Sequence, residues 1–433
     1  MAVRQYSPSR RTALVLCGTG AHGAYHAGVL RALQEAGVKI DVVAGQGVGA
    51  AGAVLAAIDG GSRLWDADGV WRSPKPNRFY EWTPAVRIVS LSLQVIVLVL
   101  MLSLIAMASV GASAAAREIG AAVVAAAVAT IGVTLVRARW RPGARRAFGS
   151  AWWSVAGAPL DANPAIDAFT HAVWQLIRGG ARDEQPPRDA GRRYADLLAD
   201  SVGQPGFREL MIVATDLDAR GDVVAALLRD PYRRDFIAPR PGRERRAEAL
   251  DLAGPGRDHA LDLMAAALTP PVACAPTMVT FAPDGYWRGE SHRMCERPGS
   301  ISRLFEELAG AGVSQVVVVT AVPASSAPHR LRVPRLDVRS RLGEFVAAAE
   351  AASLRDAMEH ALLRFDSLYV IAPSHNPVGP FDVGGAYDEA SDRRHTTLEL
   401  MEWAYEDAYH QFIEPVVGAS GEQIAGASSA TPR

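Results

Sequence analysis

The sequence predicts an α/β fold with a mainly parallel central sheet that is interrupted by a pair of apolar helices. Short apolar runs alternate with amphipathic helical patterns, which is typical of parallel sheets. Glycine-rich turns follow the first two of these runs, each just before a helical pattern. Two long uncharged segments then break the alternation, and they are too long to be strands.

Five strands are expected, at residues 13–17, 41–45, 209–214, 315–320 and 367–372. The helix after the first strand places Val29, Leu30 and Leu33 on one face and ends at Gly37. Two β-rich runs joined by Pro-Asp-Gly predict a β-hairpin over residues 277–290. A last helix is expected over residues 393–414, because Pro415 follows it.

The two uncharged segments predict a transmembrane hairpin. Residues 88–108 would span about 31 Å as a helix, and the more alanine-rich residues 119–136 about 27 Å. Arginine and lysine flank the pair on both outer sides, and such flanks stay in the cytoplasm. We therefore expect an inner-membrane protein whose soluble domain is cytoplasmic. The alternative is a soluble domain in which both segments are buried core helices.

This organisation divides the chain of 433 residues into a single α/β domain with one insertion. Lysine and arginine nearly balance aspartate and glutamate, which excludes a nucleic-acid binder held by bulk charge. The first residues lack the apolar core of a secretory signal. The predicted parts are a disordered N-terminus (1–11), the first part of the domain (12–85), the hairpin (86–137), the second part of the domain (138–417) and a disordered tail (418–433).

A glycine turn, Gly18-x-Gly20-x-x-Gly23, lies between the first strand and the first helix. Backbone amides in such a turn can bind a phosphate or the oxyanion of an acyl-transfer intermediate. A dinucleotide-binding domain also needs an acidic residue at the end of the second strand, whereas Asp41 begins that strand. His22 and His26 are four residues apart but lack a third ligand, so no metal site is predicted.

The second strand enters "VVAGQGVGA", which has the glycine spacing of a nucleophile elbow, G-x-S-x-G, with Gly47 at its apex. With its flanks, "LVLCGTGAHGAYHAGVLRALQEAGVKIDVVAGQGVGA" resembles the opening of the patatin-like phospholipase family. "ELMIVATDLDARGDVV", "AAALTPPVACAP" and "SQVVVVTA" resemble its later segments. The resemblance implies a three-layer α/β/α fold and lipid acyl hydrolysis by a Ser–Asp dyad, with a glycine loop that stabilises the oxyanion.

Residue by residue, the resemblance implies an oxyanion loop at Gly18, Thr19, Gly20 and Gly23, with Thr19 in place of a glycine. It places Gly47 at the serine position and Arg288 at the aspartate position, since "YWRGES" aligns with the family's D-G-G motif. Arginine only donates hydrogen bonds and cannot act as a base. Asp284, in the adjacent Asp-Gly pair, is the alternative acid.

Loss of both dyad residues predicts a pseudoenzyme. We expect a membrane-anchored protein that binds membrane lipid, a fatty-acyl ligand or a protein partner, and that uses no cofactor or metal and binds no nucleic acid. Two alternatives stay open: an active lipid acyl hydrolase with an unconventional nucleophile, and a nucleotide-binding module that uses the glycine turn.

Overall fold

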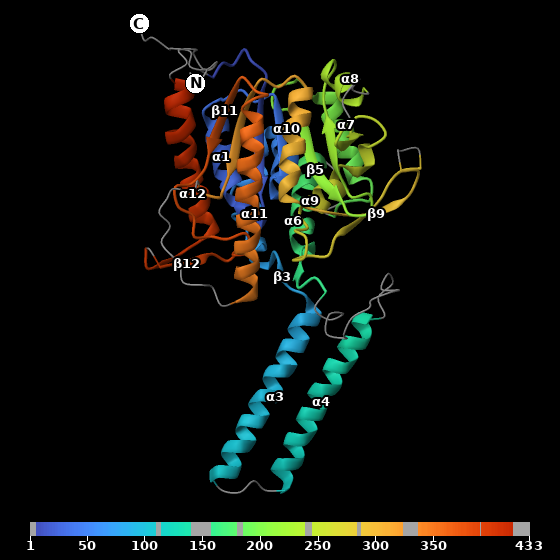
Figure 1. Cartoon of the computed structure of the whole chain (residues 1–433), viewed down its shortest axis with the longest axis vertical. Coiled ribbons are helices and arrows are strands. Elements are labelled where there is room, and N and C mark those ends of the chain that lie inside the picture. The colour runs from blue at the N-terminus through green and yellow to red at the C-terminus, as the bar shows by residue number, and fades with distance from the viewer. Residues whose placement is uncertain are drawn as a thin grey trace. The chain divides into compact units, whose positions relative to one another are not determined.

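The computed structural model describes residues 6–109, 114–139, 157–179, 185–238, 245–283, 287–323, 337–389 and 391–418. The chain forms two compact units (Figure 1). The α/β unit comprises Met1–Tyr80, Ala162–Pro271 and Pro276–Arg433, and the inserted unit comprises Glu81–Asp161 and Val272–Ala275. The inserted unit contains residues 86–137, where the hairpin is predicted.

The centre of the α/β unit is a mixed but mostly parallel sheet with the strand order β11-β10-β1-β2-β5-β6-β7. Strands β11, β10, β1, β2 and β5 are parallel neighbours, whereas β6 is antiparallel to β5. A β-hairpin, β8–β9, joins this sheet at the carboxyl end of β5, where β9 pairs with Thr215 and Asp216. The strands are β1 (Thr12–Gly18), β2 (Val42–Gly47), β5 (Glu209–Asp216), β6 (Gly221–Leu227), β7 (Ala247–Asp251), β8 (Thr277–Thr280), β9 (Ser291–Cys295), β10 (Gln315–Thr320) and β11 (Ser367–Ile371).

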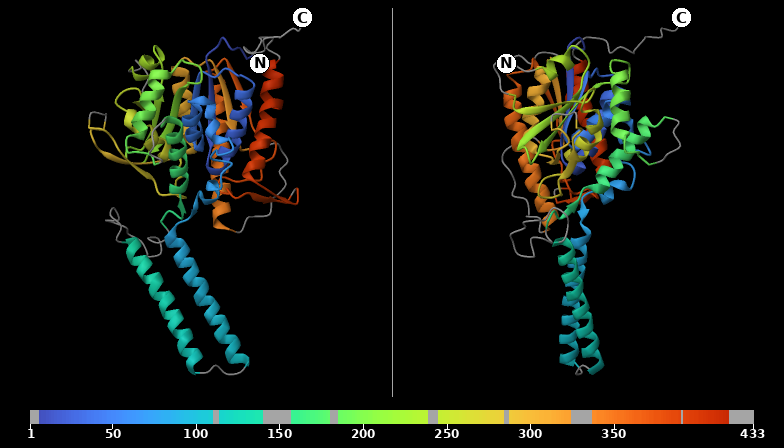
Figure 2. Two further views of the ribbon diagram at one scale, coloured as in Figure 1. Left: turned by 180° about the vertical axis from the view of Figure 1, so that it is seen from behind. Right: turned by 90° about the vertical axis from the view of Figure 1, so that its right-hand side faces the viewer.

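Helices cover both faces of the sheet (Figure 2). One face packs on α10 and α11 through Val15, Ala44, Val213 and Val318, among others. On the other face α2 packs over β1, β2 and β5, and α12 packs against α1. The helices of this unit are α1 (Gly23–Glu35), α2 (Val48–Ala56), α6 (Asn163–Ile177), α7 (Ala190–Ser201), α8 (Tyr232–Ile237), α9 (Ala260–Ala267), α10 (Ile301–Gly310), α11 (Val338–Ala361) and α12 (Thr397–Ala408), with 3₁₀ turns at Gly20–His22, Asp59–Leu64, Lys75–Arg78, Arg257–His259 and Pro298–Ser300.

This arrangement confirms the predicted α/β fold class with a mostly parallel sheet, and all five predicted strands are present to within two residues at each end. Because β1 and β2 are parallel neighbours, their carboxyl ends meet at one edge, where Gly18 lies opposite Gly47. That edge is where ligand sites form in open α/β sheets.

The inserted unit contains two long helices, α3 (Pro84–Ser109) and α4 (Ala114–Arg139), which pack against each other. A two-stranded ribbon of β3 (Glu81–Trp82) and β4 (Leu160–Asp161) brings together the segments that enter and leave them. Residues Pro84–Ile105 and Arg117–Arg137 are long and apolar enough to cross a membrane, with mean hydropathies of 2.7 and 2.4. Length and composition therefore agree with the predicted hairpin.

Three predictions differ from the structure. The N-terminus is ordered from residue 6, because Tyr6 is buried and its hydroxyl donates to the Lys39 carbonyl. In the predicted β-hairpin, β8 pairs with β9, and β9 lies after residue 290. The loop between the two strands is therefore longer than Pro-Asp-Gly. The last helix begins after a short ribbon of β12 (Ala386–Asp388) and β13 (Arg393–His395), where Thr396 and Glu399 form a capping box. That helix continues past Pro415 as a π-helical segment, Tyr409–Val417.

Candidate functional site

The turn between β2 and α2 has the backbone of a nucleophile elbow. Gly47 has φ 63° and ψ −136°, a conformation that side-chain-bearing residues adopt only under strain. Added Cβ atoms at Gly45 and Gly49 would lie 2.1 Å and 2.0 Å from the carbonyl oxygens of Gly49 and Leu16. Close contact of strand and helix therefore requires these glycines, and the sequence prediction of an elbow at Gly47 agrees with this geometry.

The space beside Gly47 is filled by a carboxyl group. A Cβ at position 47 would lie 2.5 Å from Glu296 Oε1 and 2.3 Å from the Gly18 carbonyl oxygen. Glu296 directly follows β9 and is 2% exposed. A nucleophile's side chain would thus have to displace both a buried glutamate and backbone.

A second buried glutamate joins Glu296 through one hydroxyl group. Thr19 Oγ1 lies 2.5 Å from Glu296 Oε1 and is also hydrogen bonded to Glu350 Oε1, from α11. Gln46 donates to Glu296 Oε1 at 2.9 Å, and His22 Nδ1 lies 3.2 Å from Glu350 Oε2. A threonine hydroxyl has one proton, so it donates to one carboxyl only, and the other must be protonated and donate to Oγ1.

Burial identifies which carboxyl takes that proton. Desolvation and the negative charge of Glu350 together raise the pKa of Glu296 well above its ordinary value. Burial therefore favours Glu296 as the carboxyl that carries the shared proton. Burial also raises the pKa of the Cys17 thiol and lowers that of His26 to about 3, so neither supplies a thiolate or an imidazolium nearby.

The glycine turn is packed against a distant loop. The Ala21 amide donates to the Pro380 carbonyl oxygen at 2.8 Å. A Cβ at Gly20 would lie 2.0 Å from that same oxygen, and one at Gly23 would lie 2.4 Å from the Trp71 ring. Thr19 adopts an extended backbone (φ −113°, ψ 143°) that threonine tolerates. The Ala21 amide, which lies within the glycine turn but is not one of the predicted oxyanion residues, is thus already engaged within the chain.

Little space remains at this edge of the sheet. The cavity there has a volume of about 10 Å³, which is room for about one water molecule. Its lining comes from the elbow, the glycine turn and the covering helices α10 and α11: Cys17, Gly18, Gln46, Pro298, Ile301, Thr320, Glu350 and Leu354. In this conformation the site holds no acyl chain.

Comparison with known proteins gives a family match for the first part of the chain. Residues 14–163 match the family model described as patatin-like phospholipase. The chain contains a patatin-like phospholipase domain. VipD from Legionella pneumophila is a similar solved structure, with 12% sequence identity, a TM-score of 0.34 and coverage of 96% of this chain and 70% of that chain. No curated protein matches the sequence.

The matched range of the patatin-like domain contains the glycine turn and the elbow, but the predicted acid positions lie beyond it. Arg288 is exposed in the loop between β8 and β9, where its φ is 44°. Asp284 lies outside the described residues. The structure instead brings Glu296 to the elbow, eight residues after Arg288.

Sequence reasoning missed Glu296, Glu350 and Pro380. For Glu296 a signal exists, because it directly follows a strand and is the one carboxylate in "MCERPGS". Glu350 lies in an alanine-rich helix whose buried face the sequence does not mark. Pro380 reaches the patatin-like domain's glycine turn only through tertiary packing, which local sequence does not encode.

Proposed function

We propose that this chain is a membrane-anchored patatin-like protein without acyl-hydrolase activity. It would bind membrane lipid, a fatty-acyl group or a protein partner at the cytoplasmic face of the inner membrane. The observation that carries the proposal is the elbow itself. Gly47 supplies no attacking atom, and Glu296 Oε1 would lie 2.5 Å from any Cβ placed there.

Three further features support loss of the chemistry. Glu296 is the carboxyl that lies beside the elbow, but burial raises its pKa and so favours its protonated form, which does not accept a proton from a nucleophile. The Ala21 amide donates to Pro380 rather than to a reacting oxygen. The cavity at the elbow is too small for an ester substrate.

Purified full-length protein in detergent is expected to hydrolyse p-nitrophenyl esters and phospholipids at the rate of a protein-free blank. Gly47→Ser combined with Glu296→Asp restores a hydroxyl and shortens the carboxyl that fills its space, so this double variant is the one that could gain turnover. Arg288→Asp is the matched control, because Arg288 is exposed and is expected to leave the rate at background. Wild-type turnover that Thr19→Val abolishes would overturn the proposal.

Membrane attachment rests on the surface of the long helices. Leu91, Leu98 and Leu104 of α3 are more than half exposed. Such a face is stable in lipid and costly in water.

We expect the full chain to stay with membranes after alkaline extraction and to be released by detergent. Leu98→Arg adds a charge near the middle of α3, at a cost of about 3 kcal/mol for insertion, and should increase the extractable fraction. Leu363→Arg, on an 83% exposed residue of the α/β unit, is the control and should not. A wild-type protein that is soluble without detergent would contradict the membrane anchor.

A second candidate function is hydrolysis with Thr19 as nucleophile. The short distance from its hydroxyl to Glu296 favours it, because a nucleophile must lie within hydrogen-bond reach of a base. Thr19 is fully buried, however, and burial raises the pKa of Glu296, which makes it a poorer base. A fluorophosphonate adduct mapped to Thr19 would establish this alternative. Binding of a dinucleotide, measured by calorimetry, would support the nucleotide-binding alternative instead.

A further inference from the structure

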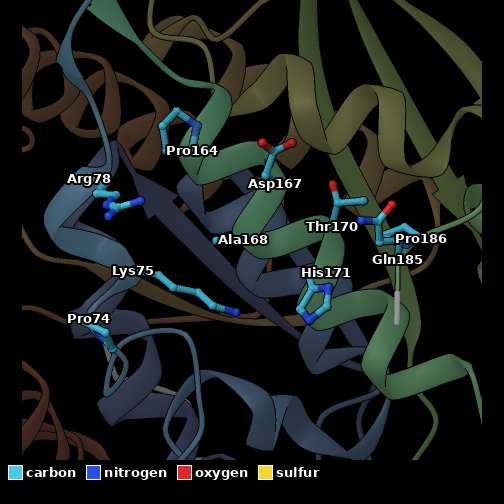
Figure 3. Close-up of a pocket in the computed structure, with 10 residues that line it drawn as sticks. All are labelled: Pro74, Lys75, Arg78, Pro164, Asp167, Ala168, Thr170, His171, Gln185 and Pro186. Carbon is cyan, nitrogen blue, oxygen red and sulfur yellow. The ribbon is translucent and has the colours of Figure 1, made fainter. Parts of the chain in front are cut away.

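A large cavity lies in the α/β unit, between the turn Lys75–Arg78 and helix α6 (Figure 3). Its volume is about 970 Å³, within the range of small-molecule sites. Figure 3 shows side chains from both segments around the same space. The lining residues are Pro74, Lys75, Arg78, Pro164, Asp167, Ala168, Thr170, His171, Gln185 and Pro186.

Within the part of the chain that the structure describes, the charged side chains of this cavity lack ion-pair partners. Among the described residues, neither Lys75 nor Arg78 forms an ion pair, and neither does Asp167. Arginine binds phosphate oxygens through two parallel hydrogen bonds, and lysine adds a point charge. Asp167, on α6, lines the same cavity. Its carboxylate would repel a ligand that carries only negative charge. The lining therefore favours a zwitterion with a phosphate and a cation.

The place of the cavity in the chain favours a lipid. Arg78 precedes the first residue of α3, Pro84, by six residues, which span at most about 21 Å. Pro164 follows β4, which pairs with β3, by only three residues. The two walls are thus the segments that lead into and out of the apolar helices. If those helices are in the membrane, as proposed above, the chain tethers Arg78 within about 21 Å of the first residue of α3.

We propose that this cavity binds the headgroup of a phosphatidylethanolamine-class lipid. Lys75 and Arg78 hold the phosphate, and Asp167 accepts hydrogen bonds from the primary ammonium group. A quaternary ammonium lacks N–H donors and prefers the faces of tryptophan, tyrosine or phenylalanine, none of which is among the described residues that line the cavity. Phosphatidylglycerol carries no cation for Asp167. Ethanolamine thus matches this set of charges better than choline or glycerol.

Calorimetry of the full-length protein in detergent, titrated with short-chain phosphatidylethanolamine, phosphatidylcholine and phosphatidylglycerol, tests this assignment. Phosphatidylethanolamine is expected to bind most tightly. Lys75→Gln with Arg78→Gln should weaken binding of all three lipids, by about tenfold or more. Asp167→Asn should weaken the binding of phosphatidylethanolamine and strengthen the binding of phosphatidylglycerol. That opposite change in two affinities is not produced by a misfolded protein.

Arg234→Gln is the matched control, since Arg234 is exposed on α8 and does not line the cavity. Equal affinity for the three lipids, or an Asp167→Asn variant with an unchanged preference, would overturn the proposal. If glycerophosphoethanolamine binds as tightly as the lipid, the site belongs to a soluble metabolite, and the proposal of a lipid ligand is overturned. The esterase measurement is independent: turnover would refute the inactive elbow and leave this binding result unaffected.

Discussion

Gly47→Ala is expected to lower the free energy of unfolding by about 2 to 6 kcal/mol. Strain at a positive φ that alanine rarely adopts contributes roughly 1 to 3 kcal/mol. Overpacking against Glu296 Oε1 and the Gly18 carbonyl oxygen contributes a similar amount. Chemical unfolding of the detergent-solubilised protein, followed by the fluorescence of the buried Trp71 and Trp174, measures the change.

Two further variants separate the causes. Gly47→Ala with Glu296→Ala removes the carboxyl contact but not the backbone contact, so the double variant should be more stable than the sum of the single effects. Gly221→Ala is the control, because nothing lies within 4 Å of a Cβ there, and its effect should stay within about 0.5 kcal/mol. If Gly47→Ala were as stable as Gly221→Ala, the elbow would not be closely packed.

The fold was predictable because its signals are local. The core strands are continuous apolar runs such as "QVVVVT", and burial on both faces of a parallel sheet requires such runs. The elbow was predictable for a related reason. A Cβ atom at Gly45, Gly47 or Gly49 would lie about 2 Å from a backbone oxygen, so close packing favours glycine at all three positions. A glycine pattern that close packing requires is visible in the sequence.

The chemistry of the site was less predictable, because it depends on contacts between distant segments. Glu296 and Glu350 meet at Thr19, which is more than 250 residues away from either. The prediction of Arg288 relied on spacing around a glycine, and the structure places that residue on an exposed loop. The last helix was predicted to begin at residue 393 because helical periodicity does not show that residues 393–395 pair with β12.

The ionisation of Glu296 should make stability depend on pH. Its pKa is raised in the folded protein, by burial and then by Glu350, above the ordinary value of 4.5. Between that value and the raised pKa, the folded state retains a proton that the unfolded state has lost. The free energy of unfolding therefore falls as the pH rises through this window, by up to about 1.4 kcal/mol per pH unit for one such group.

Glu296→Gln isolates this effect from the chain's other titrating groups. A neutral amide mimics the protonated carboxyl, since it offers one acceptor to Gln46 and one donor to Thr19. Below pH 4.5 the difference in the free energy of unfolding between variant and wild type should be constant. Above pH 4.5 the variant should become steadily more stable relative to the wild type. A difference that stays flat up to neutral pH would mean that Glu296 is ionised in the folded state. It would then be a base beside the Thr19 hydroxyl, and Glu296 would no longer support the proposal of an inactive elbow.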